Sequence, residues 1–356
     1  MSDRYRKQTL FSGLGETGQE RLCRSTAVLI GCGALGSVIA ESLVRAGVGT
    51  LRLIDRDFVE LSNLQRQVLY DEQDVADRLP KAIAATNKLQ RINSTVRIEP
   101  HVADVTHGNI LEFIVGADLI LDGTDNFEIR FLINDAAVET GTPWVHAGCV
   151  GSQGQTMTVR PGITPCFRCL MPEAPGPGTG DTCDTAGVIG PAVQIMASLQ
   201  VIDALKILSG QPELIPPRLT IVDVWTGSFR HLNLETLSRK NCSCCGGSER
   251  LWLSGEKGSQ STVLCGRNSV QIAPVSSTAL SFDTIARRLQ SQGTVRVNPF
   301  LLTFRPMEME TTIPQADSHQ SHSQLELTLF RDGRAIISGT EDLIAAKAFY
   351  VRFIGT

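Results

Sequence analysis

The sequence predicts an α/β fold with a doubly wound, mostly parallel sheet of the Rossmann-like type, followed by a small α+β domain. Between residues 27 and 67 an apolar strand, a glycine-rich turn, a helix-period segment and a second strand follow one another. Strands keep alternating with helices up to residue 149, which is typical of a sheet covered on both faces. A polar stretch then predicts a linker at 248–261 between domains at 1–247 and 262–356.

The glycine-rich turn carries the first functional signal. A strand leads into Gly31-Cys-Gly33-Ala-Leu-Gly36, and the next strand ends at Asp55, which is the fingerprint of a nucleotide-binding βαβ unit. Gly31 allows a tight turn, Gly33 lets backbone N–H groups approach a phosphate, and Gly36 lets the helix pack closely on the strand. Asp55 is placed to accept a ribose hydroxyl. The motif alone predicts a nucleotide without saying which one.

The remaining elements of the first domain follow from hydrophobic periodicity. We expect a helical segment over 4–25, strands at 27–31, 50–55, 96–100, 119–123 and 144–148, and helices at about 34–46, 80–91 and 127–140. We then expect an antiparallel strand at 155–160, a Gly- and Pro-rich loop at 171–184, a helix at 187–209, and strands at 218–224 and 229–234. Because parallel strands end at one edge, Gly31, Asp55 and segment 122–126 should lie together.

The second domain reads as a small α+β unit. We expect strands at 262–265, 270–273 and within 294–304, helices at 282–290 and 341–351, a polar loop at 311–324, and a hairpin over 325–338 that turns at Asp332-Gly333.

Composition narrows the class of protein. The formal net charge of −4 argues against a nucleic-acid partner, which would need a basic face. The charged amino-terminal residues lack the apolar core of a signal peptide, and we find no apolar run of about 18 residues that would span a membrane. We therefore expect a soluble, cytoplasmic protein whose ten cysteines stay reduced and serve metal binding or thiol chemistry.

Two cysteine pairs predict a metal site. Cys166/Cys169 and Cys242/Cys245 have the spacing of a four-cysteine zinc site. Four thiolates leave no open coordination position, so the Zn²⁺ would be structural. Cys244 lies inside the second pair, but the spacing favours Cys242 as the partner of Cys245. Buried free thiols and disulfides are the alternatives.

Several separate blocks carry a family resemblance. They are RYRKQ (4–8), GCGALG (31–36), SNLQRQ (62–67), PKA (80–82), DGTDN (122–126), the two CxxC pairs, and TCDTAGVIGP (182–191). With these blocks in this order, the sequence resembles the ThiF/MoeB/HesA family, the bacterial relatives of ubiquitin-activating enzymes, over about 4–247. The resemblance implies ATP-dependent adenylation of the C-terminal glycine carboxylate of a ubiquitin-like sulfur-carrier protein, with release of pyrophosphate, in thiamine or molybdopterin biosynthesis.

The residues of these blocks suit a triphosphate. Arg66 and Lys81 can neutralise phosphate charge, for which hydride transfer has little use. Asp125 can hold Mg²⁺, which prefers one or two carboxylates together with phosphate oxygens. Asn126 and Arg130 would orient that group or the incoming carboxylate.

The resemblance also implies roles for Asn63 and for the amino-terminal block. Asn63, in SNLQRQ, joins the predicted nucleotide contacts. RYRKQ would be an arm that reaches the nucleotide of a partner subunit, which implies a homodimer. The family usually has arginine where this sequence has Lys7, so Lys7 and its neighbour Arg6 are both candidates for that contact. A solvated basic end is the alternative interpretation.

Cys183 is a candidate thiol for a later step. It precedes TAGVIGP, where the family places a cysteine that joins the activated carrier covalently or handles sulfur from a donor enzyme. A thiol at a helix entrance gains thiolate character from exposed backbone N–H groups. The alternative is a non-essential exposed cysteine.

Three other functions compete with adenylation of a carrier protein. An NAD-dependent oxidoreductase shares the glycine turn but leaves Arg66, Lys81, Asp125 and the cysteine pairs unexplained. A family member could instead adenylate a tRNA base or a peptide, and a scaffold could retain a decayed site. The role of the second domain is open, and recruitment of the carrier or of the next enzyme is our hypothesis.

Overall fold

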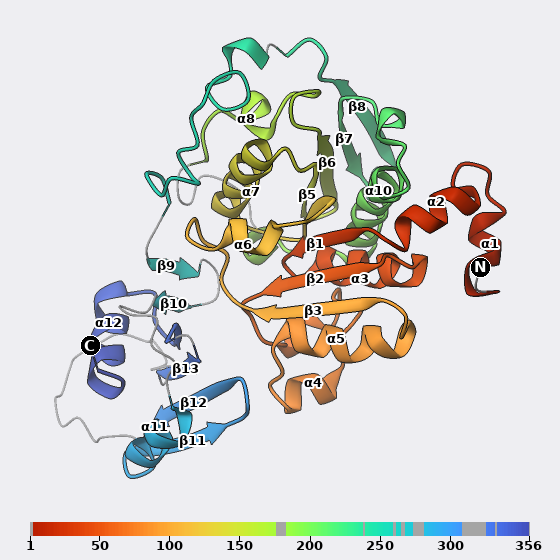
Figure 1. Cartoon of the computed structure of the whole chain (residues 1–356). Helices are drawn as coiled ribbons and strands as arrows, with labels where there is room; N and C mark the ends of the chain where they lie inside the picture. Colours follow the sequence, from red (N-terminus) through yellow and green to blue (C-terminus); the bar gives the residue numbers. More distant parts are fainter. Residues whose placement is uncertain are drawn as a thin grey trace. The chain divides into compact units, whose positions relative to one another are not determined.

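The computed structural model describes residues 3–175, 183–237, 239–258, 261–264, 268–272, 281–307, 325–331 and 333–355. The chain divides into two compact units, Met1–Gly258 and Ser259–Thr356 (Figure 1). Each unit has its own sheet and its own hydrophobic core.

The first unit is built on an eight-stranded sheet of order β3-β2-β1-β4-β5-β6-β7-β8 (Figure 1). Its strands are β1 Thr26–Ile30, β2 Thr50–Asp55, β3 Arg97–Val102, β4 Leu119–Asp122, β5 Trp144–Val150, β6 Gln153–Val159, β7 Arg218–Asp223 and β8 Ser228–Asn233. Strands β1 to β5 pair in parallel, and each strand from β6 to β8 is antiparallel to the one before it. The predicted mostly parallel sheet is confirmed.

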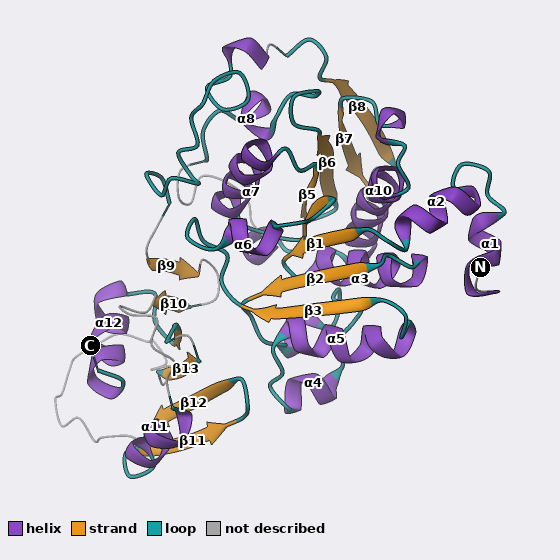
Figure 2. Ribbon diagram, in the orientation of Figure 1, coloured by secondary structure: helices purple, strands orange, loops and turns teal. Residues whose placement is uncertain are grey.

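Helices cover both faces of this sheet (Figure 2). They are α1 Arg6–Thr9, α2 Gly15–Leu22, α3 Ala34–Ala46, α4 Glu72–Ala76, α5 Lys81–Ile92, α6 Ile110–Ile114, α7 Phe127–Thr140, α8 Phe167–Leu170, α9 Cys183–Ala186 and α10 Gly190–Leu208. Strand β1 shows why: Ala27 and Leu29 pack in the cluster with α3, α5 and α10, whereas Val28 and Ile30 pack in the cluster with α6 and α7. Because neighbouring residues of a strand point to opposite faces, this continuous apolar run requires two helical layers.

Helix α10 is long and apolar enough to cross a membrane by length and composition, so the expectation that no apolar run reaches about 18 residues was wrong. It packs instead as a core helix, since Met196, Ala197 and Ala204 are fully buried among residues of α3 and β5. The helix was predicted at 187–209. Of the loop predicted at 171–184, residues 176–182 lie outside the described residues.

The first unit extends beyond the predicted boundary at 247. The backbone N–H of Trp252 donates to Asp135 Oδ2 at 3.0 Å, and its ring stacks on Phe131 with centroids 5.2 Å apart. Arg250 forms an ion pair of 3.2 Å with Glu139. Residues 248–258 of the predicted linker are thus packed on the first unit. The contacts of Trp252 stabilise this packing although the residues around it are mostly polar.

The second unit has a six-stranded sheet of order β11-β12-β13-β14-β10-β9, in which every pair is antiparallel. Its elements are β9 Ser261–Leu264, β10 Ser269–Ile272, α11 Phe282–Leu289, β11 Gly293–Val297, β12 Leu301–Pro306, β13 Glu326–Phe330, β14 Ala335–Ser338 and α12 Leu343–Phe353. Both helices contribute to one core with alternate strand residues, such as Leu302 and Phe304. The predicted polar loop 311–324 and the turn residue Asp332 lie outside the described residues.

Candidate active site

The glycine turn between β1 and α3 is packed against the end of β4. Gly31 has φ +90°, and a Cβ there would lie 2.7 Å from the carbonyl oxygen of Gly123. A Cβ at Gly36 or at Gly123 would overlap the carbonyl oxygen of Gly31. At Gly33 the nearest atom would be 3.9 Å away. The outer glycines are therefore required by packing, whereas Gly33 presents open backbone to a ligand.

Asp55 ends β2 beside this turn. Its carboxylate accepts hydrogen bonds from the backbone N–H of Cys32 at 2.6 Å and of Asp57 at 2.7 Å. Burial raises the pKa of Asp55; the nearby Lys81 charge opposes that rise, and Asp57 adds to it. Asp55 thus holds the glycine turn while each of its oxygens keeps a second lone pair for a ribose hydroxyl.

Lys81 begins α5 close to the same turn and is only 3% exposed. Its Nζ lies 3.2 Å from Asp57 Oδ2, and its backbone N–H donates to the Asp57 carbonyl. Tyr70 Oη donates to the carbonyl oxygens of Cys32 and Lys81 at 2.7 and 3.3 Å. These contacts join the start of α5 to the glycine turn and place a cation next to Asp55. Asp57 and Tyr70 were not predicted, because neither lies in a motif.

The SNLQRQ segment forms the next wall. Asn63 is buried, and its Oδ1 accepts from the backbone N–H of Glu60 at 3.2 Å, so it shapes the turn. Arg66 is half-buried, and its Nη1 donates to the Ser62 carbonyl at 3.0 Å.

Gln67, at the end of this segment, is a residue that sequence reasoning missed. It is 4% exposed, and its Oε1 has no hydrogen-bond partner among the residues that the structure describes. Its Nε2 lies 3.9 Å from the position of a Cβ on Gly33. A buried amide with spare hydrogen-bonding capacity is therefore next to the open glycine. Its membership of the SNLQRQ block was the signal available.

The DGTDN segment connects β4 to α7. Asp125 is exposed at this turn, while Asn126 Oδ1 accepts from the backbone N–H of Glu128 at 2.7 Å and caps α7. Arg130 is only 6% exposed, and its guanidinium donates to Asp122 and to the Thr124 carbonyl. Asp125 thus faces solvent, whereas Asn126 and Arg130 have partners within the turn.

The amino-terminal arm is not near the glycine turn of its own chain. Arg6 and Lys7 are exposed in α1. The next residue, Gln8, donates from Nε2 to the carbonyl of Ala46, the last residue of α3, at 2.9 Å. This contact lies at the edge of the sheet opposite the carboxyl ends of the strands (Figure 1).

Cys183 is the first residue of α9, and its side chain lies outside the described residues. The backbone just after α9 is tied to the turn between β5 and β6, because Gly151 donates to Gly187 and Ile189 donates to Gly151. A Cβ on Gly190, at the start of α10, would lie 3.4 Å from the carbonyl of Gln65. The segment that follows Cys183 therefore leads to the SNLQRQ wall.

The two cysteine pairs come together beside the middle of α7, where Phe167 and Cys244 contact Asn134. The Sγ atoms of Cys166, Cys169, Cys242 and Cys245 all lie within 4.8 Å of one another. The separations of 3.9, 3.7 and 3.4 Å for the pairs 166–169, 166–242 and 169–245 fit a tetrahedron with Zn–S bonds of about 2.3 Å. Cys244 is fully buried and contacts both Cys166 and Asp135, but it lies outside this group of four. The four predicted residues thus form a group that can hold zinc.

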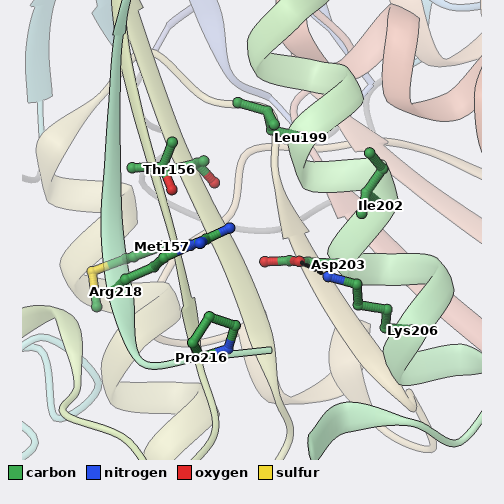
Figure 3. A pocket seen from close by; sticks show the side chains of 9 residues that line it. Thr156, Met157, Leu199, Ile202, Asp203, Lys206, Pro216 and Arg218 are labelled. Carbon is green, nitrogen blue, oxygen red and sulfur yellow. Dashed lines mark hydrogen bonds and ion pairs between the residues drawn. The ribbon is translucent and has the colours of Figure 1, made fainter. Parts of the chain in front are cut away.

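A cavity of about 160 Å³ lies elsewhere, between α10 and strands β6 and β7 (Figure 3). Asp203 and Lys206 from α10 and Arg218 from β7 contribute its charged side chains. Asp203 is already engaged, since it accepts from Thr158 at 2.7 Å and from Lys206 at 3.4 Å. None of the predicted site residues lines this cavity.

Comparisons with known proteins agree with the fold. The sequence profile of the ThiF family matches residues 5–244. Sulfur carrier protein ThiS adenylyltransferase of Bacillus subtilis is 44% identical over 356 residues, which are 100% of both chains. Sulfur carrier protein adenylyltransferase of Thermus thermophilus is 40% identical over 249 residues, 68% of this chain and 90% of the relative.

Solved structures show the same fold. The crystal structure of E. coli MccB with ATP matches with a TM-score of 0.60 and 22% identity, over 69% of this chain and 75% of that chain. The profile match spans the glycine turn, the SNLQRQ and DGTDN segments and three of the four clustered cysteines. The chain belongs to the ThiF family.

Proposed function

We propose that this protein is an ATP-dependent adenylyltransferase that activates the C-terminal glycine carboxylate of a ubiquitin-like sulfur-carrier protein of the ThiS type. The observation that carries the proposal is the full-length, 44% identical relative that is named for this activity. The geometry supports it, because the open backbone at Gly33, the cation of Lys81 and the carboxylate of Asp125 come from the loops at one edge of the sheet.

In this reaction a carboxylate oxygen attacks the α-phosphorus of ATP, and pyrophosphate leaves. Both reactants are anionic, so the protein mainly positions them and neutralises charge. Asp55 would take the ribose, the N–H groups around Gly33 the phosphates, and Lys81 and Arg66 the negative charge. Mg²⁺ held by Asp125 would supply further positive charge to the phosphates. A hydride-transferring enzyme would have little use for these cations, so we do not favour an oxidoreductase.

We also propose a homodimer in which Lys7, or Arg6, reaches the nucleotide of the partner subunit. The arm lies far from its own glycine turn, and the adjacent Leu10 and Phe11 are each 70% exposed. Ile202 on α10 is 50% exposed and adds to the apolar surface available for a partner. Large exposed apolar groups of this kind are typical of interfaces.

The proposal also covers the cysteines and the cellular location of the protein. Zn²⁺ held by the four clustered cysteines would be structural, because four thiolates saturate it. Cys183 would receive the activated carrier or sulfur from a donor enzyme. We place the protein in the cytoplasm, where its thiols stay reduced.

ATP–pyrophosphate isotope exchange tests the reaction. We expect exchange that requires a carrier protein ending in Gly-Gly and is lost in Asp125→Ala. Measuring ThiS-type and MoaD-type carriers side by side identifies the pathway. Zinc content and thermal unfolding of the variant check that it is folded. If no Gly-Gly carrier supports exchange, the substrate is something other than a carrier protein.

A further inference from the structure

A buried carboxylate lies directly behind the exposed Asp125. Asp122 is fully buried at the end of β4 and accepts four hydrogen bonds. Its Oδ1 accepts from the backbone N–H and the Oγ1 of Thr124, at 2.9 and 2.7 Å. Its Oδ2 accepts from Arg130 Nε at 3.2 Å and from His146 Nδ1 at 2.9 Å. Three elements, β4, β5 and α7, thus meet on one carboxylate.

These contacts clamp the peptide that precedes Asp125. Asp122 holds the N–H and hydroxyl of Thr124, and Arg130 Nη2 donates to its carbonyl at 2.8 Å. The residue before it, Gly123, is packed against the glycine turn and donates to the carbonyl of Ile30 at 2.8 Å. The backbone before Asp125 is therefore held through both N–H groups and a carbonyl group. These contacts fix it relative to the nucleotide-binding turn.

His146 acts in this cluster as a neutral donor. An ionised Asp122 can only accept, so Nδ1 must carry the proton. Burial lowers the pKa of His146, the hydrogen bond to Asp122 works against this, and the charge of Arg130 lowers it further. Nε2 is buried and has no hydrogen-bond partner within the described ranges. The ring is held in place by Phe167, with centroids 4.8 Å apart. An apolar environment of this kind maintains one tautomer and one ring position.

We propose that Asp122, His146 and Arg130 position the Thr124-Asp125 turn so that the Asp125 carboxylate meets the Mg²⁺ of bound Mg²⁺·ATP. Thr124 and His146 are positioning residues, since they act through Asp122 and the turn. This role rests on the proposed function, in which Asp125 holds Mg²⁺.

A matched pair of variants at Thr124 tests the proposal. Thr124→Val removes the hydroxyl with little change in shape, and Thr124→Ser keeps it. ATP binding to the full chain is measured by calorimetry, with Mg²⁺ and with EDTA. We expect Thr124→Val to bind Mg²⁺·ATP about tenfold more weakly, as for one lost hydrogen bond to a charged group, and metal-free ATP unchanged. Thr124→Ser should restore wild-type affinity in Mg²⁺.

A second pair probes the other side of Asp122. His146→Asn keeps an N–H donor near the Nδ1 position, whereas His146→Leu removes it. We expect the Asn variant to retain more of the Mg²⁺-dependent affinity than the Leu variant. The proposal is overturned if Thr124→Val weakens ATP binding equally with and without Mg²⁺, or leaves it unchanged in both. Pyrophosphate exchange in the wild type is a separate readout, so failure of the carrier reaction would not be mistaken for failure of this one.

Discussion

The partners of individual side chains decide which charges are available to a ligand. Lys81 and Arg130 are both buried cations of the site, and both were predicted to face the substrate. Lys81 contacts Asp57 beside the glycine turn, where its charge also acts on Asp55. Arg130 instead donates hydrogen bonds to Asp122 and to the Thr124 carbonyl. One cation lies next to the open backbone of the glycine turn, and the other stabilises the turn that carries Asp125.

His146 gives a pH dependence of stability. Its pKa is lowered in the folded protein, chiefly by burial, so below about pH 6.5 the unfolded chain binds a proton that the folded one does not. The His146 contribution to stability should therefore fall on acidification from pH 7 to 5, whereas the raised pKa values of Asp55 and Asp135 act in the opposite direction in wild type and variant alike. Urea unfolding of wild type and His146→Asn at both pH values measures it. The variant should lose less stability than the wild type between these pH values, and His101, whose pKa is also lowered, contributes the same loss in both proteins. Equal falls in both proteins would contradict the prediction.

Substitutions at two glycines of the turn should affect different properties. Gly36→Ala should lower stability, whereas Gly33→Ala should weaken ATP binding. Gly36→Ala places a Cβ onto the carbonyl oxygen of Gly31, and we expect a loss of about 3 kcal/mol in the free energy of unfolding. Gly33→Ala has φ −76° and no atom closer than 3.9 Å, so the fold should tolerate it. ATP affinity should nevertheless fall about tenfold, because the Cβ occupies the phosphate approach. Denaturant unfolding and ATP titration of both variants provide the measurement, and loss of stability in Gly33→Ala would argue against an open ligand face.

At the scale of elements, the cysteine cluster joins parts of the chain that are distant in sequence. It fastens α8 to the segment that follows β8, and Phe167 between the first two cysteines packs on Phe131 of α7. Such a link stabilises the packing of α7, which begins directly after the DGTDN segment. Zinc binding is therefore expected to support the site without touching the nucleotide.

Cys242 and Cys244 form a matched pair for testing the metal. We expect one zinc per chain by elemental analysis, lost in Cys242→Ser together with much of the thermal stability. Cys244→Ser should keep its zinc, because Cys244 Sγ faces Asp135 at 3.4 Å and lies outside the group of four. Wild-type protein that folds equally well after complete metal removal would contradict a structural role, and zinc loss in Cys244→Ser would contradict the ligand assignment.

At the scale of the whole molecule, the proposed dimer makes each site depend on two chains. An arm variant, Arg6→Ala/Lys7→Ala, and Asp125→Ala should each be inactive in pyrophosphate exchange. When the two are mixed and allowed to exchange subunits, each heterodimer has one site with an intact arm and an intact Asp125. Activity should return to about a quarter of wild type. No recovery, with subunit exchange verified by mass, would mean that the arm acts within its own chain.

The second unit should affect recognition of the carrier rather than chemistry. The Thermus relative is matched over 90% of its own length by 68% of this chain, which leaves too little of it for a counterpart of this unit. Truncation after Gly258 follows the boundary between the units. We expect exchange at saturating carrier to persist and the KM for the carrier to rise about tenfold. An unchanged KM would contradict recruitment of the carrier by this unit.

Local pattern determined much of the fold. The predicted spans 34–46, 50–55 and 127–140 coincide with α3, β2 and α7, because apolar periodicity and glycine caps are local properties. The short helices α4 and α6 were not predicted, since a single turn gives too few residues for a period. The end of the first unit was misplaced because the packing of Trp252 on Phe131 depends on a residue more than a hundred positions away.

The sequence by itself determined the family, the glycine turn between β1 and α3 and the identity of the four grouped cysteines, because each is carried by residues at fixed spacing. Only the tertiary structure decided which charged residues are paired inside the protein and which stay exposed. Asp122, Arg130 and His146 come from β4, α7 and β5, and only pairing of these elements buries them together. Burial then selects which charges must find partners inside the protein and leaves Asp125 exposed for a ligand.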